Sequence, residues 1–188
     1  RIGAVTEKLI VYDRLTPIEN LKVFGRLYKV PGSELSSRIE KLLKLVDLWE
    51  WRDSLVSNFS SGMRQRLNLI RALIHDPEII FLDEPTVGLD PATTVNIREF
   101  IAQLSQEGRT IILTTHQMEV AEKLSHRICI IDQGTIIALE TLDDLKAKVG
   151  PDATLEDVFI KLTGSRMRDA PKKSRFFIPQ RRWGRRPF

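Results

Sequence analysis

Residues 79–84 read Ile-Ile-Phe-Leu-Asp-Glu, an apolar run that ends in two adjacent carboxylates. Two similar runs follow at residues 110–115 and 128–131, and both are short and rich in isoleucine. Strands that are buried on both faces of a parallel sheet have this composition. Helical patterns with a period of 3.6 residues separate the runs, at residues 67–74 and 95–104. The alternation of strand and helix predicts an α/β fold built on a parallel sheet.

Two other regions depart from this alternation. Helical periodicity dominates residues 17–51 with little strand signal, so we expect an inserted helical subdomain at about residues 14–58. Residues 132–135 read Asp-Gln-Gly-Thr and join the apolar run at 128–131 to another at 136–139. This pattern predicts a β-hairpin.

Basic charge is concentrated at the C-terminal end of the chain. Residues 165–188 hold nine lysines and arginines against Asp169 alone, which makes +8, so the overall charge of +4 leaves −4 on residues 1–164. The tail has no apolar period, which predicts disorder. The preceding part is expected to be one folded domain, and its acidity argues against nucleic acid as a partner. Cys129 is the single cysteine of the chain; it excludes an internal disulfide, and its apolar neighbours predict a small buried side chain.

The two carboxylates after the first run suit metal-assisted phosphoryl transfer. One carboxylate can hold Mg²⁺ through its water shell while the next polarises an attacking water molecule. An acidic turn that merely leaves the sheet explains Asp83 and Glu84 equally well when they are taken alone. The context favours chemistry, because residues 85–91 continue Pro-Thr-Val-Gly-Leu-Asp-Pro and the second run ends in Thr-Thr-His at 114–116.

A second candidate site precedes the first run, where residues 58–62 read Asn-Phe-Ser-Ser-Gly and lead directly into a helical pattern. The start of a helix presents unpaired backbone N–H groups and the positive end of its dipole, and serine hydroxyls add further donors. Such a place binds anions. An ordinary serine N-cap explains the same residues without any ligand.

In order and spacing, these elements resemble the signature motif, Walker B motif, D-loop and switch histidine of ATP-binding-cassette (ABC) proteins. Residues 3–7 and 15–21 resemble the Q-loop and the start of the family's helical subdomain. Residues 116–138 and 155–159 are similar to drug- and multidrug-type exporter ATPases, which pair with ABC-2-type membrane permease subunits. The resemblance covers about residues 1–164 and implies a P-loop NTPase-like core that binds ATP and Mg²⁺.

The resemblance implies roles for residues near the nucleotide. Asp83 would position Mg²⁺, Glu84 would be the general base, and His116 would contact the γ-phosphate. Glu7 stands where the family's Q-loop has glutamine. A carboxylate can face Mg²⁺ but cannot donate an amide hydrogen bond.

The resemblance also implies a head-to-tail dimer of two nucleotide-binding domains. Ser60, Ser61 and Gly62 would close over the ATP held by the second domain, and Asp90 would lie at the seam between the two. Ser61 stands where the family usually has glycine, so a Cβ is present where backbone approaches phosphate, and Met63 replaces a common glutamine. Both departures predict weaker closure.

The phosphate-binding loop pattern G-x-x-x-x-G-K-[ST] does not occur in the sequence. In family order this loop and its strand come before Arg1, so we expect a C-terminal fragment that lacks the N-terminal part of its domain. The resemblance places the absent strand beside residues 79–82. We therefore expect the chain alone to be inactive and to bind ATP weakly.

The function that this resemblance implies for the parent protein is the ATP-hydrolysing subunit of an ABC exporter. Because no apolar run approaches the roughly 18 residues of a membrane helix, its place would be peripheral, on the cytoplasmic face of the membrane. Two alternatives stay open. One is a soluble ABC-family ATPase of translation or DNA maintenance, and the other is an inactive truncated product.

Overall fold

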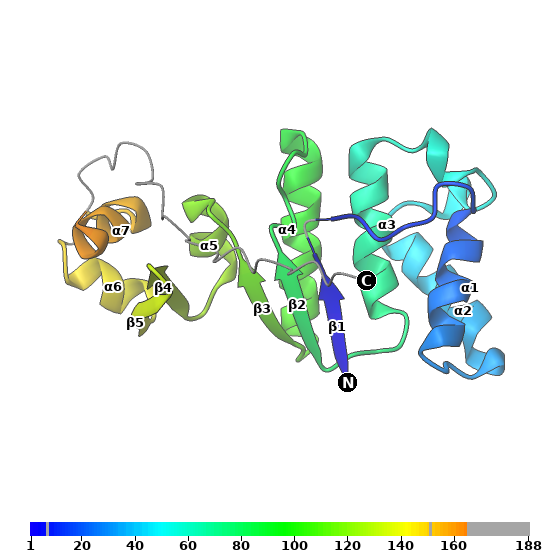
Figure 1. Ribbon diagram of the computed structural model, residues 1–188, viewed down its shortest axis with the longest axis horizontal. Coiled ribbons are helices and arrows are strands. Elements are labelled where there is room, and N and C mark those ends of the chain that lie inside the picture. Colours follow the sequence, from blue (N-terminus) through cyan, green and yellow to red (C-terminus); the bar gives the residue numbers. More distant parts are fainter. Residues whose placement is uncertain (7, 151, 165–188) are drawn as a thin grey trace, which may run out of the picture.

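The computed structural model describes residues 1–6, 8–150 and 152–164, so the tail predicted to be disordered lies outside the described residues. Helices and strands alternate along the chain after an initial strand and a helical region (Figure 1). In chain order the elements are β1 (Ile2–Val5), α1 (Pro17–Leu27), α2 (Gly32–Leu45), the 3₁₀ turns η1 (Trp49–Trp51) and η2 (Val56–Asn58), α3 (Ser61–Leu73), β2 (Ile79–Asp83), α4 (Pro91–Gln106), β3 (Thr110–Thr114), α5 (Met118–Leu124), β4 (Ile128–Asp132), β5 (Thr135–Glu140), α6 (Leu142–Ala147) and α7 (Leu155–Thr163).

A three-stranded parallel sheet forms the centre of the molecule, in the order β1-β2-β3. This confirms the predicted α/β class with a parallel sheet. Leu82 of β2 lies opposite Val5 of β1 and Leu113 of β3. Since β2 pairs on both sides, the expectation of an absent neighbour beside residues 79–82 is wrong. The edges of the described sheet are β1 and β3.

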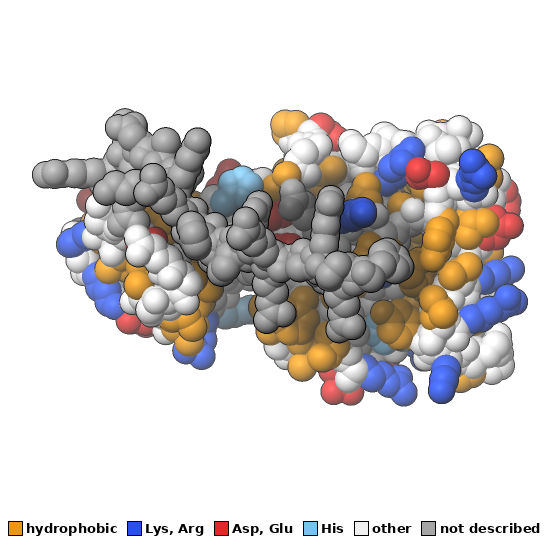
Figure 2. All heavy atoms as spheres, viewed as in Figure 1, with side chains coloured by type: hydrophobic (Ala, Val, Ile, Leu, Met, Phe, Trp, Pro, Cys, Tyr) orange, Lys and Arg blue, Asp and Glu red, His pale blue; other side chains and the backbone are white. Residues whose placement is uncertain are grey.

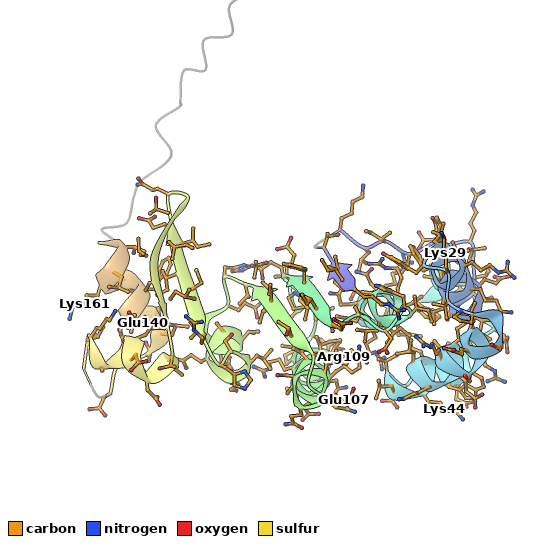
Figure 3. The ribbon with its side chains drawn as sticks, turned by 90° about the horizontal axis from the view of Figure 1, so that it is seen from below. Lys29, Lys44, Glu107, Arg109, Glu140 and Lys161 are labelled. Carbon is orange, nitrogen blue, oxygen red and sulfur yellow. The ribbon has the colours of Figure 1, made fainter. Side chains whose placement is uncertain are left out.

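Only one face of this sheet is covered by described residues. Helices α3 and α4 connect parallel strands in the order β1-β2-β3, and because such connections are right-handed as a rule, both are expected on the same side of the sheet. Figure 3 shows α4, whose end is near the labelled Glu107, on that side of the strands. There Ile80 and Leu82 are buried, whereas Phe81 and Ile112, opposite each other on the other face, are 40% and 44% exposed. The prediction of strands buried on both faces is therefore wrong, and Figure 2 shows hydrophobic side chains over the lower part of the strands.

Two α-helices and two 3₁₀ turns lie in the described chain between β1 and α3. Thr16 caps α1 through a capping box with Glu19, and Pro17 occupies the first helical turn, where a missing N–H costs nothing. Leu21 of α1 and Leu43 of α2 are fully buried in the core that also contains α3. This region therefore packs on the sheet's own helices and shares one hydrophobic core with them.

A second, smaller core lies at the opposite end of the molecule (Figure 1), where the β4–β5 hairpin packs on α6 and α7. The hairpin confirms the prediction from residues 128–139, and its turn holds Gln133 and Gly134 at positive φ. The two strands pair antiparallel, so their side chains alternate between a covered and an open face. Cys129 falls on the open face and is exposed, which corrects the prediction of a buried side chain.

Candidate functional site

The ends of β2 and β3 bring the predicted acidic residues together. Because carboxyl ends of parallel strands meet at one edge of a sheet, Asp83 pairs directly with Thr114 in the sheet register. The Thr114 hydroxyl donates a hydrogen bond to the Asp83 carboxylate. Asp83 is exposed, and within the described residues Thr114 is the side chain that hydrogen-bonds to it. Its carboxylate is accessible to a ligand at this edge.

Glu84 continues β2 in an unusual backbone conformation. Its φ is +47°, in the left-handed region that non-glycine residues rarely adopt, and its N–H donates to the Thr114 carbonyl at 3.0 Å. Such outliers persist only where surrounding contacts impose them, and they cluster at functional sites. The turn directs the Glu84 side chain toward the residues that follow β3.

The Glu84 carboxylate accepts three hydrogen bonds from that segment. Oε1 accepts from the backbone N–H of His116 at 2.8 Å and contacts His116 Nδ1 at 2.7 Å, and Oε2 accepts from the Thr115 hydroxyl at 3.1 Å. A carboxylate offers about four acceptor positions, so about one remains open here. The side chain of Glu84 is 19% exposed, against 73% for His116.

The contact with Glu84 determines the tautomer of His116. A carboxylate only accepts, so Nδ1 of His116 must carry the hydrogen in this bond. Nε2 then has a lone pair in the neutral ring, and it becomes a donor only when the ring takes a second proton. The imidazole can therefore orient Glu84 in either state but can donate to an anion through Nε2 only as the cation.

Neighbouring glutamines support this turn, and the sequence patterns did not identify them. Gln65 of α3 is buried and donates from Nε2 to the carbonyl of Pro85 at 2.9 Å. The backbone N–H of Gln117 donates to the Thr115 hydroxyl at 3.0 Å. Gln65 follows the predicted anion site by a few residues, which was the available signal, but its partner is distant in sequence.

The start of α3 combines a conventional cap with a close helix contact. Ser60 is the N-cap, and its hydroxyl accepts from the N–H of Met63 at 3.2 Å. Ser61 begins the helix and is exposed. Gly62 is buried against α4, since a Cβ at this position would lie 2.9 Å from Cγ2 of Thr93. The ordinary capping interpretation therefore holds for Ser60, and a close packing role holds for Gly62.

Asp90 caps the start of α4 beside this helix. Its carboxylate accepts from the Thr93 hydroxyl at 2.7 Å and from the Thr93 N–H at 2.9 Å, and these bonds lower the pKa of Asp90. Thr93 also contacts the position of Gly62, so the starts of α3 and α4 adjoin. The predicted residues thus form two groups: one with Asp83, Glu84 and His116, and one with Ser60 to Gly62 and Asp90.

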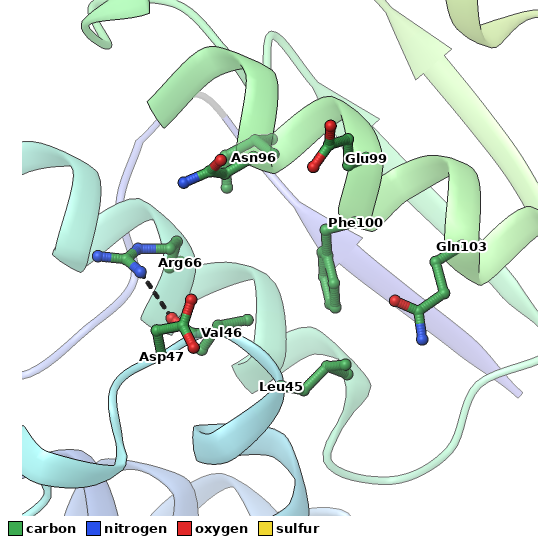
Figure 4. A pocket seen from close by; sticks show the side chains of 9 residues that line it. Leu45, Val46, Asp47, Arg66, Asn96, Glu99, Phe100 and Gln103 are labelled. Atoms are coloured by element: carbon green, nitrogen blue, oxygen red, sulfur yellow. Dashed lines mark hydrogen bonds between the residues drawn. The ribbon is translucent and has the colours of Figure 1, made fainter. Parts of the chain in front are cut away.

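Three further observations concern the surroundings of these two groups of residues. Glu7 lies outside the described residues, so its predicted place is not described. The pocket in Figure 4, about 220 Å³, lies between the end of α2, α3 and α4 and contains none of the predicted site residues; its dashed line joins Arg66 to the Val46 carbonyl at 2.7 Å. Within the described part of the chain, three or more metal-ligating side chains do not gather at any point, and no helix has the length and apolarity to cross a membrane.

Comparisons with known proteins decide the family. The family model described as "ABC transporter" matches residues 1–87, and one described as "AAA domain, putative AbiEii toxin, Type IV TA system" matches residues 53–122. The "Nod factor export ATP-binding protein I" of Cupriavidus pinatubonensis is 33% identical, over 90% of this chain and 70% of that protein. The chain belongs to the ABC transporter ATP-binding family. The "Linearmycin resistance ATP-binding protein LnrL" of Bacillus subtilis is 40% identical over 83% of this chain.

The ABC fold is also supported by a solved structure. The "Structure of ATP binding subunit of ABC transporter" matches with a TM-score of 0.76 at 29% identity, and it covers 86% of this chain and 68% of that one. The chain spans about half the length of several ABC relatives, with 50% of LnrL and 55% of the "ABC transporter ATP-binding protein NatA" of Bacillus subtilis covered.

Proposed function

We propose that this chain carries the hydrolytic half of an ATP site in the ATP-binding subunit of an ABC exporter. The observation that carries the proposal is the cluster at the ends of β2 and β3, where Glu84 accepts hydrogen bonds from His116 and Thr115. An export role is supported by the names of relatives, which include "Nod factor export" and "Linearmycin resistance".

Glu84 is the general base of this proposal. One acceptor position of about four stays open on its carboxylate, and a water molecule that bonds there gives up a proton to Glu84 as its oxygen attacks the γ-phosphate. The bond from the γ-phosphorus to the oxygen shared with the β-phosphate breaks, and ADP leaves with that electron pair. His116 holds the carboxylate in place through Nδ1–H. A contact from Nε2 to the γ-phosphate requires the protonated imidazole, because a neutral ring bonded in this way has no second donor.

Asp83 is the proposed magnesium ligand. Mg²⁺ is bound in proteins by one or two carboxylates together with waters and substrate phosphates, and an exposed carboxylate at a strand end fits that requirement. When bound there, the ion would neutralise charge on the phosphate oxygens during transfer. Thr114 orients the Asp83 carboxylate through its hydroxyl. Glu7 is proposed to face the same ion on the family resemblance alone.

The start of α3 is proposed to serve a second copy of the domain. Ser61 is exposed and Asp90 is exposed beside it, so this surface is accessible to a partner. In a head-to-tail dimer, Ser60, Ser61 and Gly62 would cover the ATP held by the other copy, with Asp90 at the seam. The dimer would drive an ABC-2-type permease from the cytoplasmic face of the membrane.

Phosphate release by the full-length subunit tests this proposal. We expect Mg²⁺-dependent hydrolysis of ATP by the full-length subunit, and only weak ATP binding by residues 1–188 in calorimetry at millimolar ATP, because most of the triphosphate grip comes from a phosphate-binding loop. A full-length subunit that releases no phosphate with or without its permease would contradict the function. Tight Mg²⁺-dependent binding of ATP by the 188 residues would contradict the proposal that most contacts to the triphosphate come from a phosphate-binding loop outside them.

A further inference from the structure

We infer that Asn68 and Arg71 are positioning residues that couple the start of α3 to β1 and to the chain just beyond it. The inference rests on the proposed function, because it concerns how closure at the start of α3 reaches the hydrolytic turn of the same chain. Both side chains are polar and buried, and the proposed chemistry does not use either of them.

Asn68 joins α3 to the segment after β1. It is completely buried, and its Oδ1 accepts from the backbone N–H of Ile10 at 3.3 Å and from Nε of Arg71 at 3.0 Å. Its Nδ2 is buried and has no hydrogen-bond partner within the described residues. An unsatisfied buried donor costs free energy. The oxygen of Asn68 is therefore the atom that this position requires.

Arg71 joins α3 to β1 itself. It is 4% exposed, its Nη2 donates to the Ala4 carbonyl at 2.9 Å, and its guanidinium lies 4.9 Å from the centre of the Phe24 ring. Among the described residues, its guanidinium bonds to Asn68 and to the Ala4 carbonyl and to no carboxylate. Burying a cation without a counter-ion is expensive. The hydrogen bond of this buried cation to the Ala4 carbonyl fixes the backbone of β1 relative to α3.

The two contacts hold both sides of one stretch of chain. Asn68 and Arg71 are three residues apart, so they lie on the same face of α3. One reaches Ala4 in β1 and the other reaches Ile10 beyond it. Helix α3 opens at its other end with the proposed nucleotide-covering residues. A rigid shift of α3 on closure would therefore move these two points of the chain together.

From β1 the connection continues to the hydrolytic turn. Ala4 pairs with Phe81 in β2, and β2 ends at Asp83, next to Glu84. Cutting this link and observing its two ends separately measures the coupling directly.

Three variants of the full-length subunit provide that measurement. Asn68→Leu keeps a similar volume but removes the acceptor, and Asn68→Asp keeps an acceptor for both donors and removes the unpartnered amide. Leu43→Ala destabilises the helical core without touching the link, because Leu43 is fully buried in α2. Its thermal melt is compared with that of Asn68→Leu, so that loss of stability can be separated from loss of coupling.

Amide hydrogen exchange with and without Mg²⁺-ATP measures the response to nucleotide at both ends of the link, the start of α3 and the segment after β1. In the unmodified protein and in Asn68→Asp, we expect nucleotide to slow exchange at residues 60–64 and also at residues 8–12. In Asn68→Leu we expect slowing at 60–64 alone, with kcat reduced about tenfold and the dissociation constant for ATP changed less than about twofold. Leu43→Ala should keep slowing at both segments.

Two results would overturn the inference. One is slowing at both segments in Asn68→Leu, and the other is an equal loss of coupling in Leu43→Ala. If nucleotide changes exchange at neither segment of the unmodified protein, the proposed function fails and the coupling fails with it. Slowing at 60–64 without slowing at 8–12 in the unmodified protein removes the coupling alone.

Discussion

Two regions of the candidate site differ in how many hydrogen bonds their side chains already make within the chain. One is the turn at the ends of β2 and β3, and the other is the start of α3. Glu84 is largely buried and accepts three hydrogen bonds from the segment after β3. At the start of α3, Ser60 only caps its own helix, and Ser61 is exposed. In the proposed dimer, one chain would therefore hold the hydrolytic groups in place, and a second copy would complete the site at the start of α3.

The largest loss of turnover is expected from a substitution at the turn that follows β2. Glu84→Gln keeps the shape of the side chain and removes the base, so turnover by the full-length subunit should fall by about a hundredfold or more while ATP binding and dimerisation persist. Glu78→Gln, at an exposed glutamate just before β2, is the matched control and should keep normal turnover. Near-normal phosphate release by Glu84→Gln would remove Glu84 from the proposed role.

His116→Ala should have the next largest effect. It removes the Nδ1–H bond that orients Glu84 but leaves the backbone N–H bond in place, so we expect a loss of about ten- to a hundredfold in kcat. His126→Ala serves as the control, since His126 is exposed just before β4. An equal change in the two variants would show that the histidine at the turn has no special part in hydrolysis.

A smaller effect is expected where α3 meets α4. Gly62→Ala places a Cβ about 2.9 Å from Thr93, so the start of α3 must shift, and ATP-dependent dimerisation should weaken about tenfold. Thr93→Ala removes the obstructing atoms. Adding Gly62→Ala to a Thr93→Ala background should therefore weaken dimerisation much less than Gly62→Ala does in the unmodified protein. Analytical ultracentrifugation with ATP measures this. A loss that stays the same in the double variant would contradict the packing explanation.

Ser61→Gly should give the smallest effect, and a favourable one. Removing this Cβ lets the helix start approach phosphate more closely, so the ATP concentration needed for dimerisation should fall about two- to fivefold. Turnover at saturating ATP should change little, because the turn at Glu84 is untouched. An unchanged or higher requirement for ATP would show that Ser61 does not limit closure.

The elements of the fold followed from local pattern where one physical rule dominated. Isoleucine-rich runs identified β2 to β5, and Asp132 to Thr135 identified the hairpin, because strand composition and turn chemistry are local properties. Strand β1 was not predicted from its residues. Exposure was predicted less well. Phe81 and Cys129 lie on faces that no described residue covers. An uninterrupted apolar run does not indicate which face of its strand is buried.

The candidate site was predictable in its residues but not in its contacts. The motifs gave Glu84 and His116 separately, yet their direct hydrogen bond depends on the positive φ of Glu84 and on the register of β2 with β3. Asn68 and Arg71 looked like ordinary polar residues of an amphipathic helix. Their partners, Ile10 and Ala4, are 58 and 67 residues away, beyond the reach of any helical period.

Mixing two inactive variants of the full-length subunit tests the account most directly. Glu84→Gln lacks the base but keeps the start of α3, and Gly62→Asp has an obstructed, negatively charged helix start but keeps the base. In a head-to-tail dimer of one of each, one of the two sites has both intact halves. We expect the mixture to recover about a quarter of normal phosphate release, since random exchange makes about half of the dimers mixed. A mixture no more active than the separate variants would contradict an ATP site shared between two chains.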